Sequence, residues 1–252
     1  MITIIVLLIL AGVTINLAVN NQGIFNKAKT ATRAYKNASE NEQTGLDEAD
    51  KEIAKYMPKE ETEGATNYTG YYADVNDDGI VDGVIFIDLA QGASGQWFQQ
   101  GDDDAGNFSY LPVTSGLRSY KISTKVSSYS GKFGTKQVIA QNGTSGSARF
   151  YVMALSDFDT NSYTWSEAYS KNQTVGSVTF RLPSKEGWSA FGRQLGITKD
   201  NYLSKGLREW YWSSTEYDIY GSNAWYADFN DGSMNSGGKP NYLCSVRLCA
   251  TF

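Results

Sequence analysis

Eighteen consecutive residues without a charge lie near the N-terminal end of the sequence, from Ile2 to Val19. Two threonines and one asparagine are the only polar residues among them. Since an α-helix rises about 1.5 Å per residue, this run forms a helix of about 27 Å, which is just long enough to cross a bilayer. We therefore predict a membrane anchor over residues 1–22. A buried core helix and a cleaved signal peptide are the alternatives, although no basic segment precedes the apolar run.

An amphipathic helix is predicted to follow the anchor, over residues 23–57. From Ile24 to Ala38 the apolar residues recur roughly along one helical stripe, and the Asn- and Gly-bearing segment before them favours a break or kink. Residues 58–69 are charged, contain Gly and Pro and have no apolar periodicity, so we predict a linker there. This leaves residues 70–252 for one globular domain.

Short runs rich in Tyr, Val, Ile and Phe alternate with clusters of Gly, Ser, Asn and Asp throughout this domain, a pattern typical of strands. The predicted strand segments are 81–90, 119–126, 136–141, 148–155, 177–182, 224–229 and 244–252. Two helices are predicted among them, one near Trp165–Ser170 and one from Ser184 to Leu195, with Ser184 as the N-cap. The fold class expected from this mixture is α+β.

The composition limits the partners and the catalytic reactions that can be expected of this chain. A net charge of -5 does not favour a nucleic-acid partner. The absence of His excludes imidazole-based catalysis and most transition-metal sites, while other kinds of enzyme become only less expected. Cys244 and Cys249 are too few for a disulfide framework, and on one strand they would point to opposite faces. We predict no catalytic residues and no required cofactor.

A calcium-binding loop is predicted in the segment DVNDDGIVDGVIF, which begins at Asp74. Its acidic, amide and glycine residues follow the spacing of the first nine positions of a calcium loop, in which alternate oxygens converge on the ion. The candidate ligands are Asp74, Asn76, Asp78, Ile80 and Asp82, with Gly79 at the turn position. Position twelve, where such loops carry Glu, is Ile85, and the nearest later carboxylate is Asp88. The alternative is an Asx-rich turn that leads into a strand.

A binding surface is predicted between Tyr217 and Ser245, where 19 of 29 residues are Tyr, Asp, Asn, Ser or Gly. Tyr provides rigid amphipathic contact area, and the short polar residues provide adaptable hydrogen bonds, as in antibody paratopes. Strand alternation within this segment predicts that Trp225, Ala227, Phe229 and Gly232 face inward and that Tyr226, Asp228 and Asn230 face solvent. An ordinary loop-rich sheet is the alternative.

Two parts of the chain resemble known families. The segment ITIIVLLILAGVTI followed by GIFNKAKTA, within Ile2–Ala34, resembles the N-terminus of type IV pilin-like proteins. The order TWSEA at 164–168, RLPSKEGW at 181–188, YWSSTE at 211–216 and the pair Val246–Arg247 resembles the formylglycine-generating-enzyme branch of the C-type lectin fold. The resemblance implies a C-type lectin domain that follows a long pilin-like helix.

Together with the Tyr-, Asn-, Ser- and Gly-rich segment, this arrangement resembles the variable proteins of diversity-generating retroelements. In that family a reverse transcriptase mutates adenines, so that surface codons diversify within a region that in this chain covers about 210–252. The resemblance implies a fixed frame of Trp212, Trp225, Phe229, Val246 and Arg247. It implies this diversified ligand-binding set: Asp218, Ile219, Tyr220, Ser222, Asn223, Tyr226, Asp228, Asn230, Ser233, Asn235, Ser236, Asn241, Tyr242, Leu243 and Ser245.

The function implied by the resemblance is that of a hypervariable receptor-like or adhesin-like protein, anchored in the cell envelope with its lectin-like domain outside the cell. Its ligand would be a protein or a glycan, and its N-terminal helix would contact the membrane and pilin-like subunits. A structural minor pilin or envelope subunit that selects no ligand is the main alternative. An oxidase of formylglycine type is a more distant one, because it requires a reactive cysteine pair.

Overall fold

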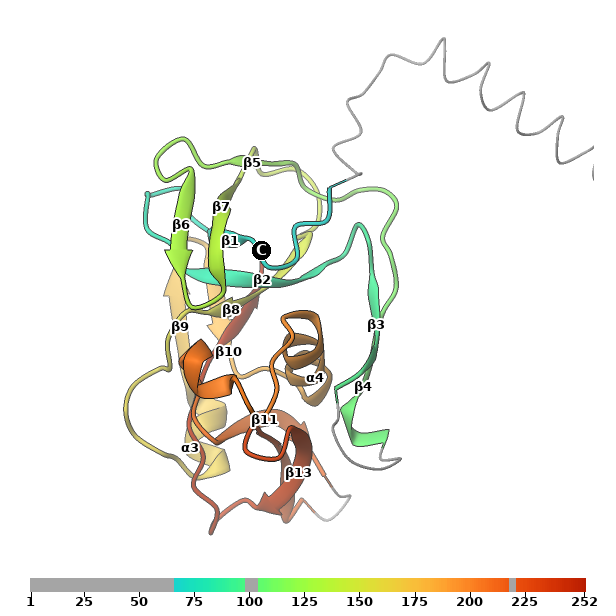
Figure 1. The fold of residues 1–252 in the computed structure, drawn as a ribbon, viewed down its shortest axis with the longest axis vertical. Coiled ribbons are helices and arrows are strands. Elements are labelled where there is room, and N and C mark those ends of the chain that lie inside the picture. The colour runs from blue at the N-terminus through green and yellow to red at the C-terminus, as the bar shows by residue number, and fades with distance from the viewer. Residues whose placement is uncertain (1–65, 98–103, 218–220) are drawn as a thin grey trace, which may run out of the picture. The chain divides into compact units, whose positions relative to one another are not determined.

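The computed structural model describes residues 66–97, 104–217 and 221–252, which belong to one compact unit starting at Gly64 (Figure 1). This unit is a mixed α+β domain made mostly of strands, so the predicted fold class is confirmed. The predicted membrane anchor, 1–22, and the predicted amphipathic helix, 23–57, lie outside the described residues. Within the three described ranges, no helix is both long and apolar enough to cross a membrane.

Nine of the described strands form the main sheet, in the order β5, β7, β1, β2, β8, β14, β10, β9, with β6 paired to β7 outside this path. The strand bounds are β1 Tyr72–Asp74, β2 Gly83–Asp88, β5 Tyr120–Ile122, β6 Ser128–Gly131, β7 Gly134–Gln141, β8 Phe150–Ala154, β9 Asn172–Val175, β10 Val178–Arg181 and β14 Cys249–Thr251. β1 and β7 run parallel, and the other pairs are antiparallel. The last strand, β14, therefore lies inside the sheet, between β8 and β10.

The strand β2 is buried along its whole length. Val84 and Phe86 belong to one hydrophobic cluster, whereas Ile85 belongs to a second. Because neighbouring side chains of a strand point to opposite faces, β2 separates the two clusters, one on each side of the sheet. The sheet is thus the central layer of the domain.

Two smaller sheets complete the strand structure. One is a three-stranded antiparallel sheet in the order β11 Trp210–Glu216, β12 Asn223–Asp228 and β13 Ser233–Gly238. The other is a ribbon of β3 Ala93–Gln96 and β4 Asn107–Tyr110. The 3-10 turns η2 Asp104–Gly106 and η3 Tyr202–Lys205 precede β4 and β11. Every predicted strand segment overlaps one of the observed strands.

Both predicted helices are present, as α3 Trp165–Ser170 and α4 Lys185–Gln194. Ser184 is the N-cap of α4, since its Oγ accepts a hydrogen bond of 3.0 Å from the Gly187 amide. α4 lies between β2 of the main sheet and the three-stranded sheet, with β3 and β4 along its side (Figure 1). The buried Trp188 Nε1 donates to the carbonyl of Trp212 at 3.0 Å, so the helix is fastened to β11.

The last residues of the predicted linker contact the domain. Arg149 Nη2 donates to the Thr66 carbonyl at 3.2 Å, and the Tyr68 ring lies 5.7 Å from that of Phe150. The guanidinium of Arg149 also stacks 5.0 Å from Tyr68 and pairs with the buried Asp88 at 2.7 Å. Residues 66–69 therefore pack against the strands of the domain rather than standing apart from it.

Candidate functional site

The three-stranded sheet β11–β12–β13 positions most of the predicted binding residues, and strand pairing decides which face each one occupies. Tyr211, Ala227 and Met234 occupy paired positions and belong to the cluster that packs against α4. One residue further along each strand, the side chains point the other way. The sheet thus has one face buried against the helix and one face directed away from it.

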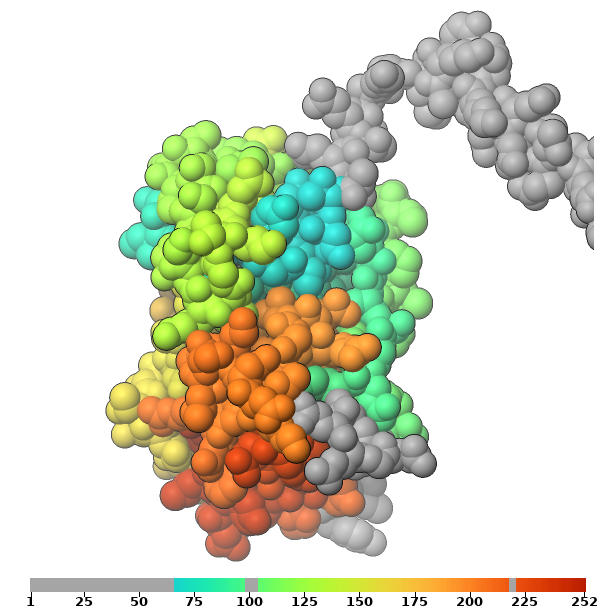
Figure 2. Space-filling model, in the orientation of Figure 1, coloured from blue at the N-terminus to red at the C-terminus, as the bar shows by residue number. Residues whose placement is uncertain are grey.

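We call the outward surface the Tyr242 face, and it consists of Trp210, Tyr226, Asp228, Ser233, Asn235, Tyr242 and Leu243. Trp210 pairs with Asp228, which pairs with Ser233, and Tyr226 pairs with Asn235. The Tyr226 ring lies 5.8 Å from that of Tyr242 and 6.4 Å from that of Trp210. This surface lies in the last third of the chain, coloured orange to red in Figure 2.

The expectation that Tyr226 points into solvent is wrong. Its side chain is on the predicted side of β12, but it is only 7% exposed because the Tyr242 ring covers it from outside and its cross-strand neighbour Trp212 packs edge-on beside it at 5.9 Å. Burial raises the pKa of the Tyr226 hydroxyl, and the nearby Asp228 carboxylate raises it further. The exposed tyrosine at this place is Tyr242, of which 44% is accessible.

The expectation of an exposed Asp228 is also wrong, because the carboxylate is tied into the turn between β12 and β13. Its Oδ1 accepts hydrogen bonds from the amides of Asn230 and Asp231 at 3.0 and 3.4 Å, and its Oδ2 accepts one from Asn235 Nδ2 at 3.4 Å. Burial raises the pKa of Asp228, and the Asp231 carboxylate adds to that increase. Asp228 orders the turn on which the exposed Asn230 is displayed.

Ser245 is buried as well, contrary to the prediction, because its backbone pairs with β11. Its amide donates to the Trp210 carbonyl at 2.9 Å, and its carbonyl accepts from the Trp212 amide at 3.3 Å. A groove of about 280 Å³ nevertheless reaches it. The lining residues of this groove are Ser162, Arg208, Glu209, Trp210, Leu243 and Ser245. Since Trp210 and Leu243 belong to both, the groove and the Tyr242 face form one continuous surface.

The remaining predicted binding residues do not form a single patch. Asn223 and Ser236 lie on the opposite face of the sheet, beside Trp225. Ser222 and Asn241 are exposed in the connecting segments at the ends of β12 and β13. Asp218, Ile219 and Tyr220 lie outside the described residues. The structure therefore brings together only Tyr226, Asp228, Ser233, Asn235, Tyr242, Leu243 and Ser245 from the predicted set, with Asn230 at the adjoining turn.

The predicted frame is buried, with one exception. Trp212, Phe229, Val246 and Arg247 are each at most 1% exposed. Trp225 is only partly buried: the exposed Tyr217 lies edge-on to its ring at 4.9 Å, and the Lys185 ammonium lies 5.0 Å from its centre. Because Trp225 lies between two side chains at the surface, it contributes less to the hydrophobic core than its predicted inward position implied.

A charged cluster that strand patterns did not reveal supports the groove from behind. Asp157 accepts hydrogen bonds from Arg247 Nε at 2.9 Å and from Tyr211 Oη at 2.8 Å, and pairs with Arg208 at 3.3 Å. Arg208 Nη1 also donates to the Thr160 carbonyl at 2.8 Å, which fixes this side chain at the groove. In the sequence, only Arg247 of the pair Val246–Arg247 pointed to this cluster, because Asp157 lies in an irregular segment with no recognisable sequence pattern.

The predicted calcium ligands form a network of hydrogen bonds with the backbone of their own loop. Asp74 accepts from the amides of Asp78 and Gly79 at 3.0 and 2.8 Å, and Asp82 accepts from the Val75 amide at 2.8 Å. The Ile80 amide donates to Asp78 at 2.7 Å, and Asn76 Nδ2 donates to Asp78 at 2.9 Å. Bonds of this kind are those of an Asx-rich turn.

The oxygen missing at position twelve has no replacement in this loop. Ile85 is fully buried, and Asp88 is engaged by Arg149. In the part of the chain that the structure describes, no three His, Cys, Asp or Glu side chains are grouped to hold a metal ion. A calcium ion in this loop would depend on Asp74, Asn76, Asp78, Asp82 and the Ile80 carbonyl, without the bidentate carboxylate that position twelve normally supplies.

The two cysteines lie in different hydrophobic clusters. Cys244 is buried in the cluster that contains Trp212, while Cys249 packs against the cluster that contains Trp188. Burial raises the pKa of both thiols, that of Cys249 to about 12. Protonated thiols are poor nucleophiles, so this arrangement does not provide a reactive cysteine pair at neutral pH.

The chain matches no protein-family model and no curated protein.

Proposed function

We propose that this chain is a surface-displayed, receptor-like or adhesin-like protein that binds a protein or glycan ligand through the Tyr242 face and its groove. The observation that carries this proposal is the separation of an exposed layer from a buried base. Tyr242 and Leu243 are 44% and 55% exposed, whereas Tyr226, on which the Tyr242 ring packs, is 7% exposed and its cross-strand neighbour Trp212 is fully buried. Exposed side chains can therefore change without loss of the base.

The composition of this layer fits a contact surface for a macromolecule. Aromatic rings provide large contact area with few rotors to order, and Ser, Asn and Asp provide hydrogen bonds that adapt to the partner. The groove of about 280 Å³ is at the lower end of the size of small-molecule sites, so it accommodates one protruding group of a larger ligand. Arg208 and Glu209 at the groove supply charges of both signs for that group.

We further propose that the domain has the C-type lectin fold of the formylglycine-generating-enzyme branch and that a retroelement diversifies its binding residues. The motifs that carry the resemblance occupy compatible elements: TWSEA begins α3, RLPSKEGW leads into α4, YWSSTE lies in β11 and Val246–Arg247 precedes β14. The apolar run Ile2–Val19 supports a pilin-like membrane anchor and a place in the cell envelope, with the domain outside the cell.

A structural subunit that selects no ligand is the second candidate. The observation in its favour is that Tyr226, Asp228 and Ser245, three members of the proposed diversified set, are buried. A formylglycine-type oxidase has no such support, because the two thiols lie in separate clusters.

The DNA beside the gene distinguishes the two candidates. Diversification requires a near-copy of the codons for 210–252, with adenines at the codons of exposed residues such as Asn230, Tyr242 and Leu243, and an adjacent reverse-transcriptase gene. Finding both supports the ligand-binding proposal. If neither is present, the structural subunit takes its place.

A stability comparison tests the layered arrangement itself. Replacing Leu243 and Asn230 with Ser should change the free energy of unfolding by only about 0.5 kcal/mol each, because both side chains are exposed. Trp212→Ala should cost about 3–5 kcal/mol, because it leaves a cavity in the base. Urea unfolding measures all three variants, and similar losses in all of them would contradict the layered arrangement.

A further inference from the structure

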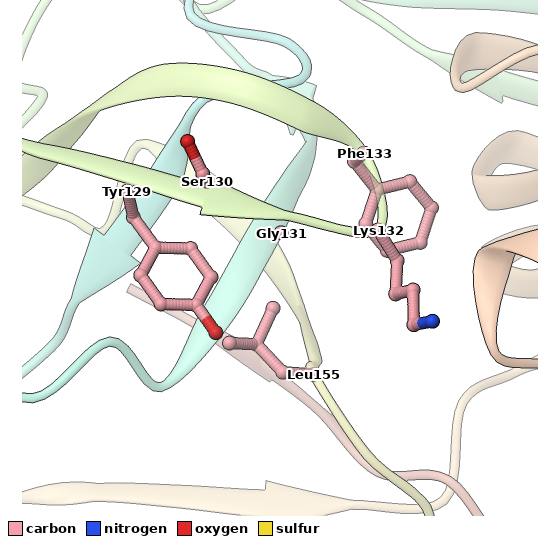
Figure 3. A pocket seen from close by; sticks show the side chains of 6 residues that line it. All are labelled: Tyr129, Ser130, Gly131, Lys132, Phe133 and Leu155. Carbon is pink, nitrogen blue, oxygen red and sulfur yellow. The ribbon is translucent and has the colours of Figure 1, made fainter.

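A second pocket lies under the hairpin formed by β6 and β7, and none of its lining residues belongs to the Tyr242 face. It has a volume of about 400 Å³ and is lined by Tyr129, Ser130, Gly131, Lys132, Phe133 and Leu155. Figure 3 shows the rings of Tyr129 and Phe133 extending from the hairpin to the side on which Leu155 lies. The Lys132 side chain extends beside Phe133, and Ser130 points away. The pocket thus has two aromatic walls, an aliphatic floor and an ammonium at its edge.

Contacts from the core hold both walls in place. The buried Tyr72 hydroxyl donates to the Gly134 carbonyl at 3.0 Å and accepts from the Phe133 amide at 3.2 Å. The Tyr129 ring packs edge-on against Tyr72 at 4.9 Å, and the Phe133 ring packs against Phe191 of α4 at 5.9 Å. A pocket whose walls are already fixed loses little conformational entropy when a ligand enters.

Gly131 is required for this arrangement because there is no room for a side chain. A Cβ at this position would lie 2.6 Å from the Tyr72 hydroxyl and 2.6 Å from the Tyr129 ring. Either the hydroxyl or the ring would have to move. The Tyr129 ring is a wall of the pocket, and the Tyr72 hydroxyl holds the backbone of Phe133, which carries the other wall. The position of the Tyr129 ring therefore depends on a glycine at residue 131.

The charge around the pocket is positive. Within the described residues, neither Lys132 nor Lys205 forms an ion pair, and the Lys205 ammonium lies 5.7 Å from the centre of the Phe133 ring. The next residue, Gly206, accepts a hydrogen bond of 2.6 Å from Arg247 Nη2. Figure 2 shows the yellow-green hairpin beside the orange segment that contains these residues.

The guanidiniums behind Gly206 add to this positive potential. Arg247 and Arg208 share one carboxylate, that of Asp157, so this group of three side chains keeps an excess positive charge. The Nη1 atom of Arg247 is buried and has no hydrogen-bond partner within the described residues. Unpaired cations next to low-dielectric walls attract an anion more strongly than cations in water.

We propose that this pocket binds a small organic carboxylate whose body is a ring. The aromatic walls and Leu155 bury the ring, and Lys132 with Lys205 pairs with the carboxylate. Inorganic phosphate satisfies the ammoniums but leaves the walls uncovered, and a neutral ring leaves the ammoniums unpaired. The volume of about 400 Å³ lies within the range of small-molecule sites and suits a single substituted ring. This site is independent of the function proposed for the Tyr242 face.

Titration of the full-length protein with four probes tests the charge and ring requirements: benzoate, D-glucuronate, benzamide and inorganic phosphate. Benzoate represents an aromatic carboxylate and D-glucuronate a sugar carboxylate, so their ranking identifies the kind of ring. At least one should bind, and benzamide and phosphate should bind about tenfold more weakly than the better carboxylate, because each lacks one of the two interactions. Ligand-observed NMR measures the dissociation constants.

Variants place the binding at this pocket. Lys132→Met should weaken the better carboxylate about fivefold to tenfold, since it removes the charge but keeps most of the side-chain volume. Lys136→Met is the matched control, because Lys136 lies on β7 outside the lining and should leave the affinity unchanged. Gly131→Ala should weaken binding as well, with circular dichroism as the check on folding. Absence of binding by both carboxylates, or equal affinities of the Lys132→Met and wild-type proteins, overturns the proposal.

Discussion

Asp82 has an unfavourable electrostatic environment at the start of β2. Burial raises its pKa from the ordinary value of 3.8 to about 6, and the carboxylates of Asp74 and Asp78 contribute to the increase although the Val75 amide opposes it. A group whose pKa is higher in the folded state stabilises the fold when it is protonated. The stabilisation from Asp82 is therefore complete below pH 3.8 and is lost as the pH rises through about 6.

Replacing this carboxyl group should change the pH dependence of stability. In the wild-type protein, ionisation of Asp82 between pH 4 and pH 7 should lower the free energy of unfolding by about 1–2 kcal/mol, a value reduced for solvent screening because the side chain is partly exposed. Asp82→Asn should remove this decrease. Urea unfolding at several pH values in the presence of EDTA measures the difference, and the exposed Asp200→Asn is the control. Parallel profiles for Asp82→Asn and the wild type would contradict the effect.

Tyr226 shows that local sequence predicts the side of a strand on which a residue lies but not its exposure to solvent. Alternation along residues 224–229 predicts its side of the strand correctly, because that property depends only on local geometry. Its exposure depends on Tyr242, which lies on a separate segment and covers the ring. No local pattern contains that information, so the side chain expected to be exposed is buried and the exposed ring belongs to the covering residue.

Among the structural elements, the apolar ones were predictable and the polar strands were not. β2 and β8 consist largely of Val, Ile, Phe, Tyr and Met, whereas β3, β9 and β13 are built mainly from Ser, Gly, Asn, Gln and Thr. β13 contains no β-branched or aromatic residue, and it exists because it pairs with β12 along all six of its residues. The Asp231–Gly232 pair between the two strands is a hairpin signal that could have located it.

The helix α4 offers a test of packing at the level of an element, because it contains two glycines in different surroundings. A Cβ at Gly192 would lie 2.4 Å from the Trp97 ring, whereas one at Gly187 would meet its nearest neighbour at 3.5 Å. Gly192→Ala should therefore lower the free energy of unfolding by about 1–3 kcal/mol, as overpacked positions do. Gly187→Ala is the matched control and should be neutral or stabilising by up to about 1 kcal/mol, since Ala favours a helix. Equal effects in urea unfolding would show that Trp97 does not limit this position.

At the scale of the whole molecule, an uncharged apolar segment precedes a globular domain of mixed composition. The run Ile2–Val19 has no charge, while the described residues, 66–97, 104–217 and 221–252, contain their own two hydrophobic clusters on a continuous sheet. A domain with its own core does not need the N-terminal residues for folding. This division is a prediction from composition alone, because it does not depend on contacts between distant residues.

Cell fractionation tests the two halves of this division. The full-length protein should sediment with membranes, because the apolar run is long enough to span a bilayer. A fragment that begins at Thr62 should remain in the soluble fraction and give the circular dichroism spectrum and cooperative unfolding of a folded β-rich domain. Recovery of the full-length protein in the soluble fraction would contradict the anchor, and an unfolded fragment would contradict the independent core.

The interior position of β14 determines what happens to chains that are truncated by a premature stop codon. If a retroelement diversifies this part of the chain, as proposed, a premature stop codon before Cys249 removes β14, and β8 and β10 then both lose their shared neighbour in the middle of the main sheet. A mutational process that creates stop codons would thus yield chains that cannot complete their sheet and that cellular proteases can degrade. Only chains translated through the last strand would fold. Folding would therefore remove truncated variants before the binding surface is displayed.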